Sequence, residues 1–216
     1  MRTDARVVIV GAGGHGKVVA DALHRERPDA AFCFADDQPR LWGQTILGQE
    51  VLGRASDVLS EADWFHIAIG HNAFRAQAFE AMLAKAAAPL SIVHPSAHLS
   101  PFASVGRGAF LAAASVVAPS AKIGDAVIVN HGAIIDHDCD VGPYCHIAPG
   151  ASLSGGVSLG PGVLVGTGAR VLPGIRVGIN AVIGAGAVVT RNVGEGEQVV
   201  GVPARSVVRE RDAKKD

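Results

Sequence analysis

Asp136, His137 and Asp138 place a histidine between two carboxylates, within a segment that is otherwise rich in Gly, Val and Ile. A carboxylate bonded to one nitrogen of an imidazole fixes the tautomer, raises the basicity of the other nitrogen and stabilises the imidazolium. We therefore predict that His137 is a general base. Asp138 is the expected orienting partner, while Asp136 is the competing candidate for that role or a contact to the substrate. The structural alternative is a solvated cluster of surface charges.

A strict repeat surrounds this cluster. From Ile92 to Val193 the sequence divides into hexads without an insertion, and the second position of each hexad is Val, Ile or Leu. The sixth position is nearly always small, and proline recurs at the fourth. A period of six residues is typical of a parallel β-helix, in which each hexad forms a short strand and a corner and three hexads complete one triangular coil. The alternative, a disordered segment of low complexity, would lack a fixed aliphatic position.

The repeat predicts where the side chains of the cluster point. His137 occupies the fourth position of its hexad, at a corner, so its ring should project outward from the prism. Stacked coils lie ~4.8 Å apart, and one coil beyond His137 stands Gly155, whose unobstructed N–H could donate to an oxyanion. Asn130 and His146 belong to other columns and should face away from His137 within one chain. A second copy packed alongside could bring them to it, and threefold packing would create three such sites.

A metal site is another chemistry that this segment could support, because His131, His137, Cys139 and His146 are close in sequence. One hexad spans one face of the prism, so His131 and His137 should lie at different corners, while Cys139 should point inward. We therefore expect no metal. The chain has three cysteines, an odd number at spacings that match no disulfide or metal motif, and we expect them to be small buried residues.

The N-terminal part follows a different pattern, in which buried-type strands alternate with amphipathic helices as in a βαβαβ unit. The sequence thus predicts an α/β half-Rossmann domain over residues 1–90 and a parallel β-helix over 91–194. A C-terminal strand and a charged tail are expected over 195–216. The join should lie near Pro89 to Pro95, where Pro and Ser interrupt the helical pattern.

The first strand of this domain ends in a glycine turn that opens a helix, an arrangement whose N–H groups and helix dipole hold phosphate. Asp36 and Asp37 follow the second strand, where a ribose or base would lie. The chain has about one mononucleotide-binding half, so we expect a nucleoside diphosphate joined to another group rather than NAD. His15 could donate near the pyrophosphate or be a surface histidine, and Arg75 could face phosphate or be an exposed helix residue. The candidate nucleotide-binding residues are Gly11, Gly13, Gly14, His15, Gly16, Asp36, Asp37, Gly70 and Asn72.

The overall charge and the start of the chain limit the partners. Nineteen basic and 20 acidic residues give a formal net charge of −1, and no basic surface for nucleic acid is evident. The apolar run near the start of the sequence is too short for a signal peptide or a membrane span. We therefore expect a cytoplasmic location, with neither nucleic acid nor a membrane as partner.

The motifs "GAGGHG", "AIGHNAFR", "DHDCDVG" and "VVGVPAR", together with the hexads, resemble the bacterial nucleotide-sugar acetyltransferases of the hexapeptide-repeat family, sialic-acid O-acetyltransferase type. The resemblance covers essentially the whole chain, and the combination of motifs is specific although each motif alone is not. It implies a left-handed β-helix, a homotrimer, acetyl-CoA as donor and a nucleotide-linked sugar held by the N-terminal domain. It also implies a place in lipopolysaccharide or O-antigen biosynthesis.

The resemblance assigns roles to individual residues. The family's catalytic histidine, acidic partner and amide donor match His137, Asp138 and Gly155, and members often carry glutamate where this chain has aspartate. Asn130 matches an asparagine one hexad before the base, and His146 matches a histidine that lies near the acetyl group. The pantetheine arm should follow the Gly- and Ala-rich coils after Gly155, although coil geometry alone explains most of these glycines. The expected acetyl-CoA contacts are His146, Gly155, Gly166, Ala169, Gly184 and Ala187.

The implied activity is direct N-acetyl transfer from acetyl-CoA to the amino group of a nucleotide-linked amino sugar, of the GDP-perosamine or UDP-4-amino-sugar type, with His137 as base and no metal. Three other classes are open at this point. The first is an O-acetyltransferase acting on a sugar such as sialic acid, and the second is a zinc β-helix enzyme similar to the γ-type carbonic anhydrases. The third is a scaffold protein without catalytic activity, since the hexads specify only the solenoid.

Overall fold

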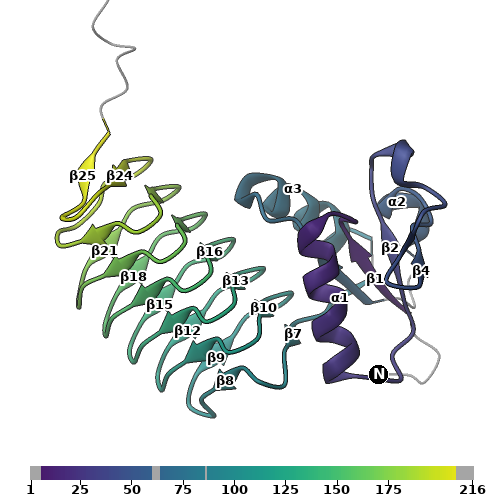
Figure 1. Ribbon diagram of the computed structural model, residues 1–216, viewed down its shortest axis with the longest axis horizontal. Coiled ribbons are helices and arrows are strands. Elements are labelled where there is room, and N and C mark those ends of the chain that lie inside the picture. Colours follow the sequence, from purple (N-terminus) through teal and green to yellow (C-terminus); the bar gives the residue numbers. More distant parts are fainter. Residues whose placement is uncertain (1–5, 60–63, 86, 208–216) are drawn as a thin grey trace, which may run out of the picture.

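The computed structural model describes residues 6–59, 64–85 and 87–207, which form an N-terminal α/β unit beside a β-helix (Figure 1). The α/β unit has a parallel sheet in the order β2-β1-β5-β6. Its strands span Val7–Val10 (β1), Phe32–Ala35 (β2), Trp64–Ile67 (β5) and Ala88–Pro89 (β6). Its helices span Gly14–Glu26 (α1), Ala55–Val58 (α2) and Asn72–Leu83 (α3), and a 3-10 turn (η1, Pro39–Leu41) and a small hairpin (β3, Thr45–Ile46; β4, Gln49–Glu50) complete it.

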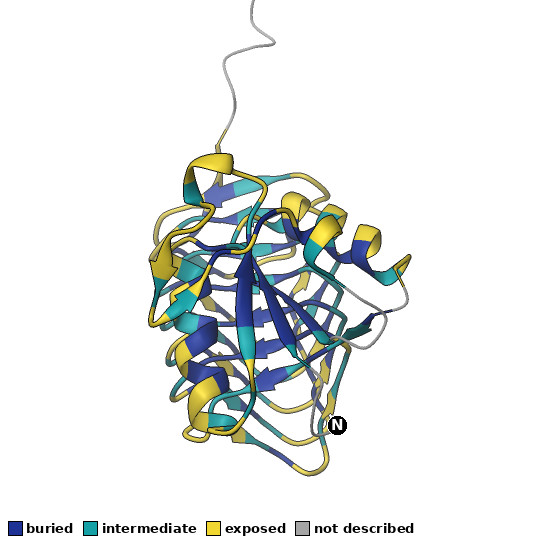
Figure 2. Cartoon of the chain, turned by 90° about the vertical axis from the view of Figure 1, so that its right-hand side faces the viewer, coloured by how far each residue is buried: buried dark blue, intermediate teal, exposed yellow. Residues whose placement is uncertain are grey.

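These elements follow from the apolar pattern of the sequence. Every residue of β1 is buried, as expected for a strand covered on both faces. Helix α1 buries Gly16, Val19, Ala20 and Leu23, a spacing of three and four residues that makes one apolar stripe. Figure 2 looks onto this unit and shows its central strands buried, while the helices carry exposed residues on their outer sides.

The β-helix has three faces, each a parallel sheet whose neighbouring strands lie one coil apart. The first face contains β7 (Ile92–Val93), β10 (Phe110–Leu111), β13 (Ile128–Val129), β16 (His146–Ile147), β19 (Leu164–Val165) and β22 (Val182–Ile183). The second contains β8 (His98–Leu99), β11 (Val116–Val117), β14 (Ile134–Ile135), β17 (Ser152–Leu153), β20 (Arg170–Val171) and β23 (Val188–Val189). The third contains β9 (Ser104–Val105), β12 (Lys122–Ile123), β15 (Asp140–Val141), β18 (Ser158–Leu159) and β21 (Arg176–Val177). We number the corners in chain order. The first corner joins the first face to the second face, the second corner joins the second face to the third, and the third corner joins the third face back to the first.

The core of the prism confirms the register predicted from the hexads. Second-position side chains such as Val129, Ile147 and Val165 are fully buried, and small sixth-position residues such as Cys145 fill the space between them. Burial of one such aliphatic side chain stabilises the fold by about 1.5–3 kcal/mol, so a charged residue at any second position would break the stack. All three cysteines are free and buried, as expected.

The backbone ladder explains why proline recurs at the fourth position. First-, third- and fifth-position N–H groups donate to neighbouring coils, as in His146 N to Val163 O, Ala148 N to Val165 O and Gly150 N to His131 O, each 2.9 Å. The fourth position supplies no N–H to this ladder, so proline costs it no bond. The fifth position lies in the left-handed region, with φ +65° at Gly150, which favours glycine there.

The α/β unit packs against the first face of the β-helix. Outward first-position residues Ile92, Phe110 and Ile128 share one buried cluster with Val19 and Leu23 of α1. On the third face the corresponding positions are Ser104, Lys122, Asp140, Ser158 and Arg176, which are partly or fully exposed. The first face therefore carries a buried second apolar layer that the third face lacks, and this layer fixes where the two units join.

The C-terminal strand β24 (Gln198–Val200) extends the first face beyond β22, and β25 (Arg205–Ser206) pairs with it antiparallel. The charged tail expected at the end of the chain lies outside the described residues from 208 onward. None of the helices in the described ranges has the length and apolar character that a bilayer crossing requires.

Candidate active site

His137 stands at the second corner with its side chain 62% exposed, outside the prism as the repeat predicted. Its Nδ1 lies 2.8 Å from Asp138 Oδ2. This hydrogen bond raises the pKa of His137 above its ordinary value, and the charge of Asp136 adds to the effect. The Asp136 carboxylate itself accepts the backbone N–H of His137 at 2.8 Å. The two carboxylates therefore make different contacts: Asp138 bonds to the imidazole ring of His137, whereas Asp136 bonds to its backbone N–H.

Gly155 lies directly against the imidazole, one coil further along. A Cβ built on Gly155 would lie 2.5 Å from Cε1 and 2.6 Å from Nε2 of His137, which is closer than any side chain can approach. As a fourth-position residue, Gly155 also has an N–H that the ladder does not use. The corner thus brings an exposed imidazole and a backbone amide together. The residues along its fourth-position column are Pro101, Pro119, His137, Gly155, Pro173 and Arg191.

Asp138 adopts the left-handed conformation, with φ +59°. It is a fifth-position residue, where many other coils carry glycine, and a side chain in this conformation costs of order 1 kcal/mol or more. Aspartate tolerates the conformation better than most residues. Other fifth positions such as Ala126 and Tyr144 share this conformation, so the coil geometry sets the backbone of Asp138, and its bond to His137 distinguishes it.

Asn130 and His146 lie on a different side of the prism from His137 and contact each other. His146 Nδ1 is 3.2 Å from Gly70 O, and because a carbonyl only accepts, this nitrogen carries the proton. His146 Nε2 therefore accepts from Asn130 Nδ2 at 3.1 Å. Both nitrogens of His146 are thus bonded within the chain, and the remaining Asn130 N–H is the donor left for a ligand.

His15 is half-buried as a residue, and its imidazole ring is directed against the first face of the β-helix. Its ring packs edge-on against Phe110 at a centroid distance of 5.4 Å and lies 6.4 Å from the ring of His146. Burial, with the nearby His66 and His146, lowers the pKa of His15 to about 3. The interpretation of His15 as a surface residue is therefore wrong, because the first face of the β-helix covers it. Its Nε2 is buried and has no hydrogen-bond partner among the described residues.

Both sequence-based interpretations of Arg75 are also wrong. Its side chain is 1% exposed, and it donates to backbone carbonyls of both structural units rather than projecting into solvent or toward a phosphate site. Asn72 likewise uses its amide group on the β-helix, donating to Gly162 O at 2.8 Å and to Val163 O at 3.1 Å. Its Oδ1 accepts from Arg75, so the Asn72 amide links Arg75 to the β-helix, and its N–H groups are already used there.

A cleft of about 690 Å³ opens at the carboxyl ends of β1 and β2 and extends along α3. Asp36 and Asp37 line it, but both oxygens of Asp36 already accept backbone N–H groups, from Ala12 and Gln38 at 2.9 Å each. Asp37 has no partner within the described part of the chain. The other residues that line the cleft are Val10, Gly11, Gln38, Arg54, Ala55, Ser56, Ile69, Phe74, Gln77, Ala78, Ala81 and Met82.

The glycines of the turn divide into two groups. Gly11 has φ +110°, and a Cβ on Gly16 would meet Gly11 O at 2.1 Å, so these two glycines allow the strand, turn and helix to pack closely. Gly13 and Gly14 have open space around them, which leaves the N-terminus of α1 accessible to an anion.

Among the expected acetyl-CoA contacts, Ala169 and Ala187 are fully buried inside the prism, so their side chains cannot touch a ligand. A Cβ on Gly166 would lie 2.6 Å from Ala185 N, and one on Gly184 would lie 2.7 Å from a side-chain atom of Val200. These glycines are therefore required by coil stacking, so at these four positions no side chain is available to contact a cofactor.

His131 and His137 lie at different corners, and no group of three or more His, Cys, Asp or Glu side chains within the described ranges is arranged to hold a metal ion. Cys139 and Cys145 point into the prism, where burial raises the pKa of both thiols, to about 12 for Cys145. Neither cysteine is suited to act as a nucleophile.

Comparison with known proteins gives a consistent result. Residues 6–82 match the family model of the PglD N-terminal domain, and residues 120–155 match that of the bacterial transferase hexapeptide. The chain is similar to PerB from Caulobacter crescentus, whose structure contains CoA and GDP-perosamine (34% identity over 95% of this chain and 98% of that one, TM-score 0.87). It is also similar to the acetyltransferase domain of PglB from Neisseria gonorrhoeae (34% identity, 94% and 100%, TM-score 0.88), which has been solved with acetyl coenzyme A. WeeI from Acinetobacter baumannii is 28% identical over 94% and 100% of the two chains, with a TM-score of 0.88. A comparison with curated protein sequences gives no match.

Proposed function

Since the chain belongs to the hexapeptide-repeat acetyltransferases, with a PglD-type N-terminal domain on a left-handed β-helix, we propose that it transfers an acetyl group from acetyl-CoA to the amino group of a nucleotide-linked amino sugar. The observation that carries the proposal is the pair at the second corner, an exposed His137 bonded to Asp138 and lying against Gly155. The donor and the acceptor correspond to the CoA and the GDP-perosamine that the PerB structure contains.

In this mechanism His137 Nε2 removes a proton from the amino group as its nitrogen attacks the thioester carbonyl carbon. The Gly155 N–H donates to the oxyanion of the tetrahedral intermediate. When the carbon–sulfur bond breaks, the imidazolium returns the proton to the departing thiolate. Asp138 stabilises the imidazolium throughout, and its bond to Nδ1 directs Nε2 outward. No covalent enzyme intermediate is needed, in agreement with the raised thiol pKa values of Cys139 and Cys145.

The cleft between β2 and α3 is the proposed nucleotide site, with the diphosphate near Gly13 and Gly14. Phe74 is 61% exposed beside it and offers a ring for stacking on the base. The unpaired Asp37 carboxylate presents two acceptors, which match the adjacent N1–H and N2–H donors of guanine. In uracil or thymine, N3–H is flanked by two carbonyl oxygens, which are acceptors like the carboxylate oxygens and would repel them. We therefore propose a GDP-linked sugar ahead of a UDP- or dTDP-linked one.

The active form is proposed to be a homotrimer. In one chain the free N–H of Asn130 and the base His137 belong to different corners, so both can reach one substrate only if a second prism packs against the first. In a threefold assembly each interface would combine His137 of one copy with Asn130 of the next. Light scattering of the purified protein measures the number of copies, and a monomer with full activity would contradict this part of the proposal.

The test of the function is a transfer assay with purified protein. GDP-, UDP- and dTDP-linked 4-amino sugars are each incubated with acetyl-CoA, and free thiol release and product mass are followed. We expect CoA release with one added acetyl group per sugar, fastest for the GDP-linked substrate, and a melting temperature raised by the same nucleotide. Failure to release CoA with every amino sugar would contradict the function, whereas a preference for UDP would contradict only the role of Asp37.

A further inference from the structure

Arg75 is a buried cation in the interior of the molecule. It lies on α3 with 1% of its surface exposed, and within the described ranges no carboxylate forms an ion pair with it. Burial lowers its pKa to about 10, which still leaves it protonated near neutral pH. An unpaired buried charge is tolerated only when hydrogen bonds satisfy it, so the partners of the guanidinium show what it does.

Those partners come from both structural units. On its own side, Arg75 donates to Ile69 O at 3.0 Å and Gly70 O at 3.1 Å, in the loop after β5, and to Asn72 Oδ1 at 2.8 Å. On the β-helix side it donates across the third corner, to Ala126 O at 2.8 Å, Tyr144 O at 2.7 Å and Cys145 O at 3.1 Å. One planar side chain therefore joins the loop that borders the nucleotide cleft to two successive coils.

The Gly70 carbonyl continues this network toward the proposed acetyl-transfer site. It also accepts from His146 Nδ1 at 3.2 Å, and His146 Nε2 accepts from Asn130. The path Arg75, Gly70, His146, Asn130 thus consists of direct contacts, and it fixes which nitrogen of His146 is protonated and how the Asn130 amide is turned. Burial, with the charge of Arg75, also lowers the pKa of His146 to about 4, which keeps this ring neutral.

We propose that Arg75 is a positioning residue for acetyl transfer. By holding the Gly70 carbonyl between the two units, it sets the orientation of His146 and Asn130 relative to a sugar held in the N-terminal cleft. Arg75 itself touches neither substrate. The proposal rests on the function proposed above.

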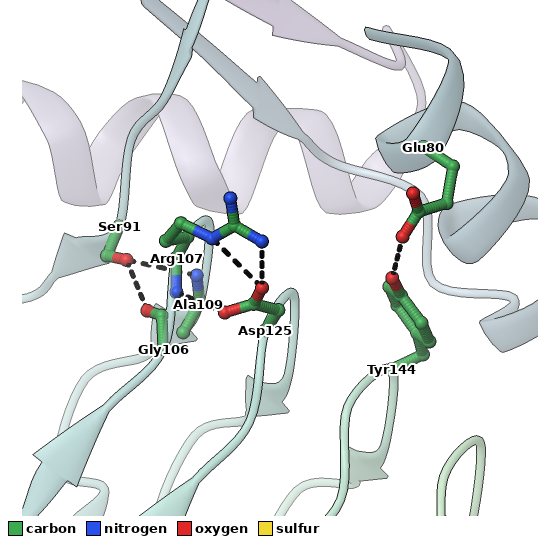
Figure 3. Close-up of polar contacts among 7 residues, drawn as sticks. All are labelled: Glu80, Ser91, Gly106, Arg107, Ala109, Asp125 and Tyr144. Atoms are coloured by element: carbon green, nitrogen blue, oxygen red, sulfur yellow. Dashed lines mark hydrogen bonds and ion pairs between the residues drawn. The ribbon is translucent and has the colours of Figure 1, made fainter. Parts of the chain in front are cut away.

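The other end of α3 supplies a matched control. Glu80, on the same helix, accepts a short hydrogen bond from Tyr144 Oη at the third corner (Figure 3). Phe79 packs against Gly108, where a Cβ would lie 2.5 Å from its ring. These contacts also join the two units, but within the described ranges no side-chain hydrogen bond links Glu80 or Phe79 to Arg75, Gly70 or His146. Tyr144 contributes only its backbone carbonyl to the Arg75 network, and Tyr144→Phe keeps that carbonyl while removing the bond to Glu80. Figure 3 also shows Arg107, an arginine near the same corner that pairs with Asp125 and is exposed.

The experiment compares Arg75→Lys with Tyr144→Phe and Arg107→Gln in the full-length protein. Lysine keeps the charge but not the planar arrangement of donors, so we expect kcat to fall about 10- to 100-fold. The KM values for both substrates and the dissociation constant of the free nucleotide should stay within about twofold of wild type, because misplacement of the reacting groups affects turnover more than binding. Tyr144→Phe should lower the melting temperature yet keep kcat within about twofold, and Arg107→Gln should change neither.

Several results would overturn the proposal. A kcat near the wild-type value in Arg75→Lys would do so, and a raised KM with unchanged kcat would indicate a binding role instead. An equal loss of kcat in Tyr144→Phe would show that any weakening of the contact between the units has the same effect. If Arg75→Lys does not fold, ¹⁵N NMR of wild-type histidines decides, since the network requires a neutral His146 protonated at Nδ1 near pH 7. A lack of acetyl transfer by the wild-type protein would count against the proposed function, while the tautomer of His146 would still test the network.

Discussion

The second corner and the contact between the two units use histidine in opposite ways. At the corner, His137 is exposed, touches a carboxylate and has a raised pKa. Between the units, His15, His66 and His146 are largely buried, lie near Arg75 and have pKa values lowered to about 3, 4 and 4. The first environment suits a group that gains and loses a proton during turnover. The second suits rings that stay neutral and serve as fixed hydrogen-bonding or packing groups.

The largest expected effect comes from removing His137, the proposed proton acceptor at the second corner. His137→Ala should lower kcat by about 10³-fold, because the imidazole of His137 is the group that lies against Gly155. Nucleotide-sugar affinity should be nearly unchanged, since the cleft belongs to the other unit. Steady-state kinetics and calorimetric titration measure the two quantities. A kcat near the wild-type value would reject His137 as the base.

A second change moves the ring without removing it. Gly155→Ala would place a Cβ 2.5 Å from the imidazole, so the ring must shift by about an ångström, and a displacement of that size costs on the order of 10²-fold in kcat. The double variant with His137→Ala should lose little beyond the single His137→Ala variant, because both changes act on one group. Independent, multiplying losses would show that Gly155 and His137 do not act together.

The buried histidines predict how stability depends on pH. In the unfolded chain these rings have the ordinary histidine pKa of about 6.5, but in the folded protein burial lowers the pKa of His66 and of His146 to about 4. The unfolded state therefore binds more protons between these pH values, and stability falls as pH drops from about 6.5 to about 4, by on the order of 3 kcal/mol for each such ring. Thermal melts across this range measure the effect. His66→Gln, which can still donate to Leu90 O but does not titrate, should show a shallower decline, and an identical pH dependence would contradict the assignment.

The smallest expected effect comes from neutralising the partner of the base. Asp138→Asn tolerates the left-handed backbone but no longer stabilises the imidazolium, so the pKa of His137 should fall. Because the base must be unprotonated to act, kcat declines as pH drops through this pKa, and the variant should show that decline at lower pH. At its optimum we expect about tenfold lower kcat, since a weaker base transfers protons less efficiently. A pH–rate profile identical to wild type would assign the orienting role to Asp136 instead.

The sequence predicts the corner well because a fixed period turns sequence distance into spatial distance. His137 and Gly155 differ by one coil, and their contact follows from counting. The network around Arg75 could not be predicted in this way, since its partners Ala126 and Tyr144 become neighbours only after the α/β unit packs against the β-helix. A usable signal was present in the first positions of the hexads, which are apolar at Ile92, Phe110 and Ile128 and polar on the third face. That pattern identifies the covered face but not which helix residues reach across it.

The fourth-position column of the second corner, which contains His137 and Gly155, has a practical consequence for engineering. Each coil repeats the same geometry at a step of ~4.8 Å. His137 and Gly155 therefore occupy two neighbouring positions in a series of equivalent corners. Exchanging His137 and Gly155 with the residues at equivalent corners would move the two groups along the β-helix axis by one coil at a time, without a change in the fold. The distance along the β-helix between the proposed nucleotide cleft and the proposed base would therefore be adjustable in whole coils, to suit acceptor sugars of different length.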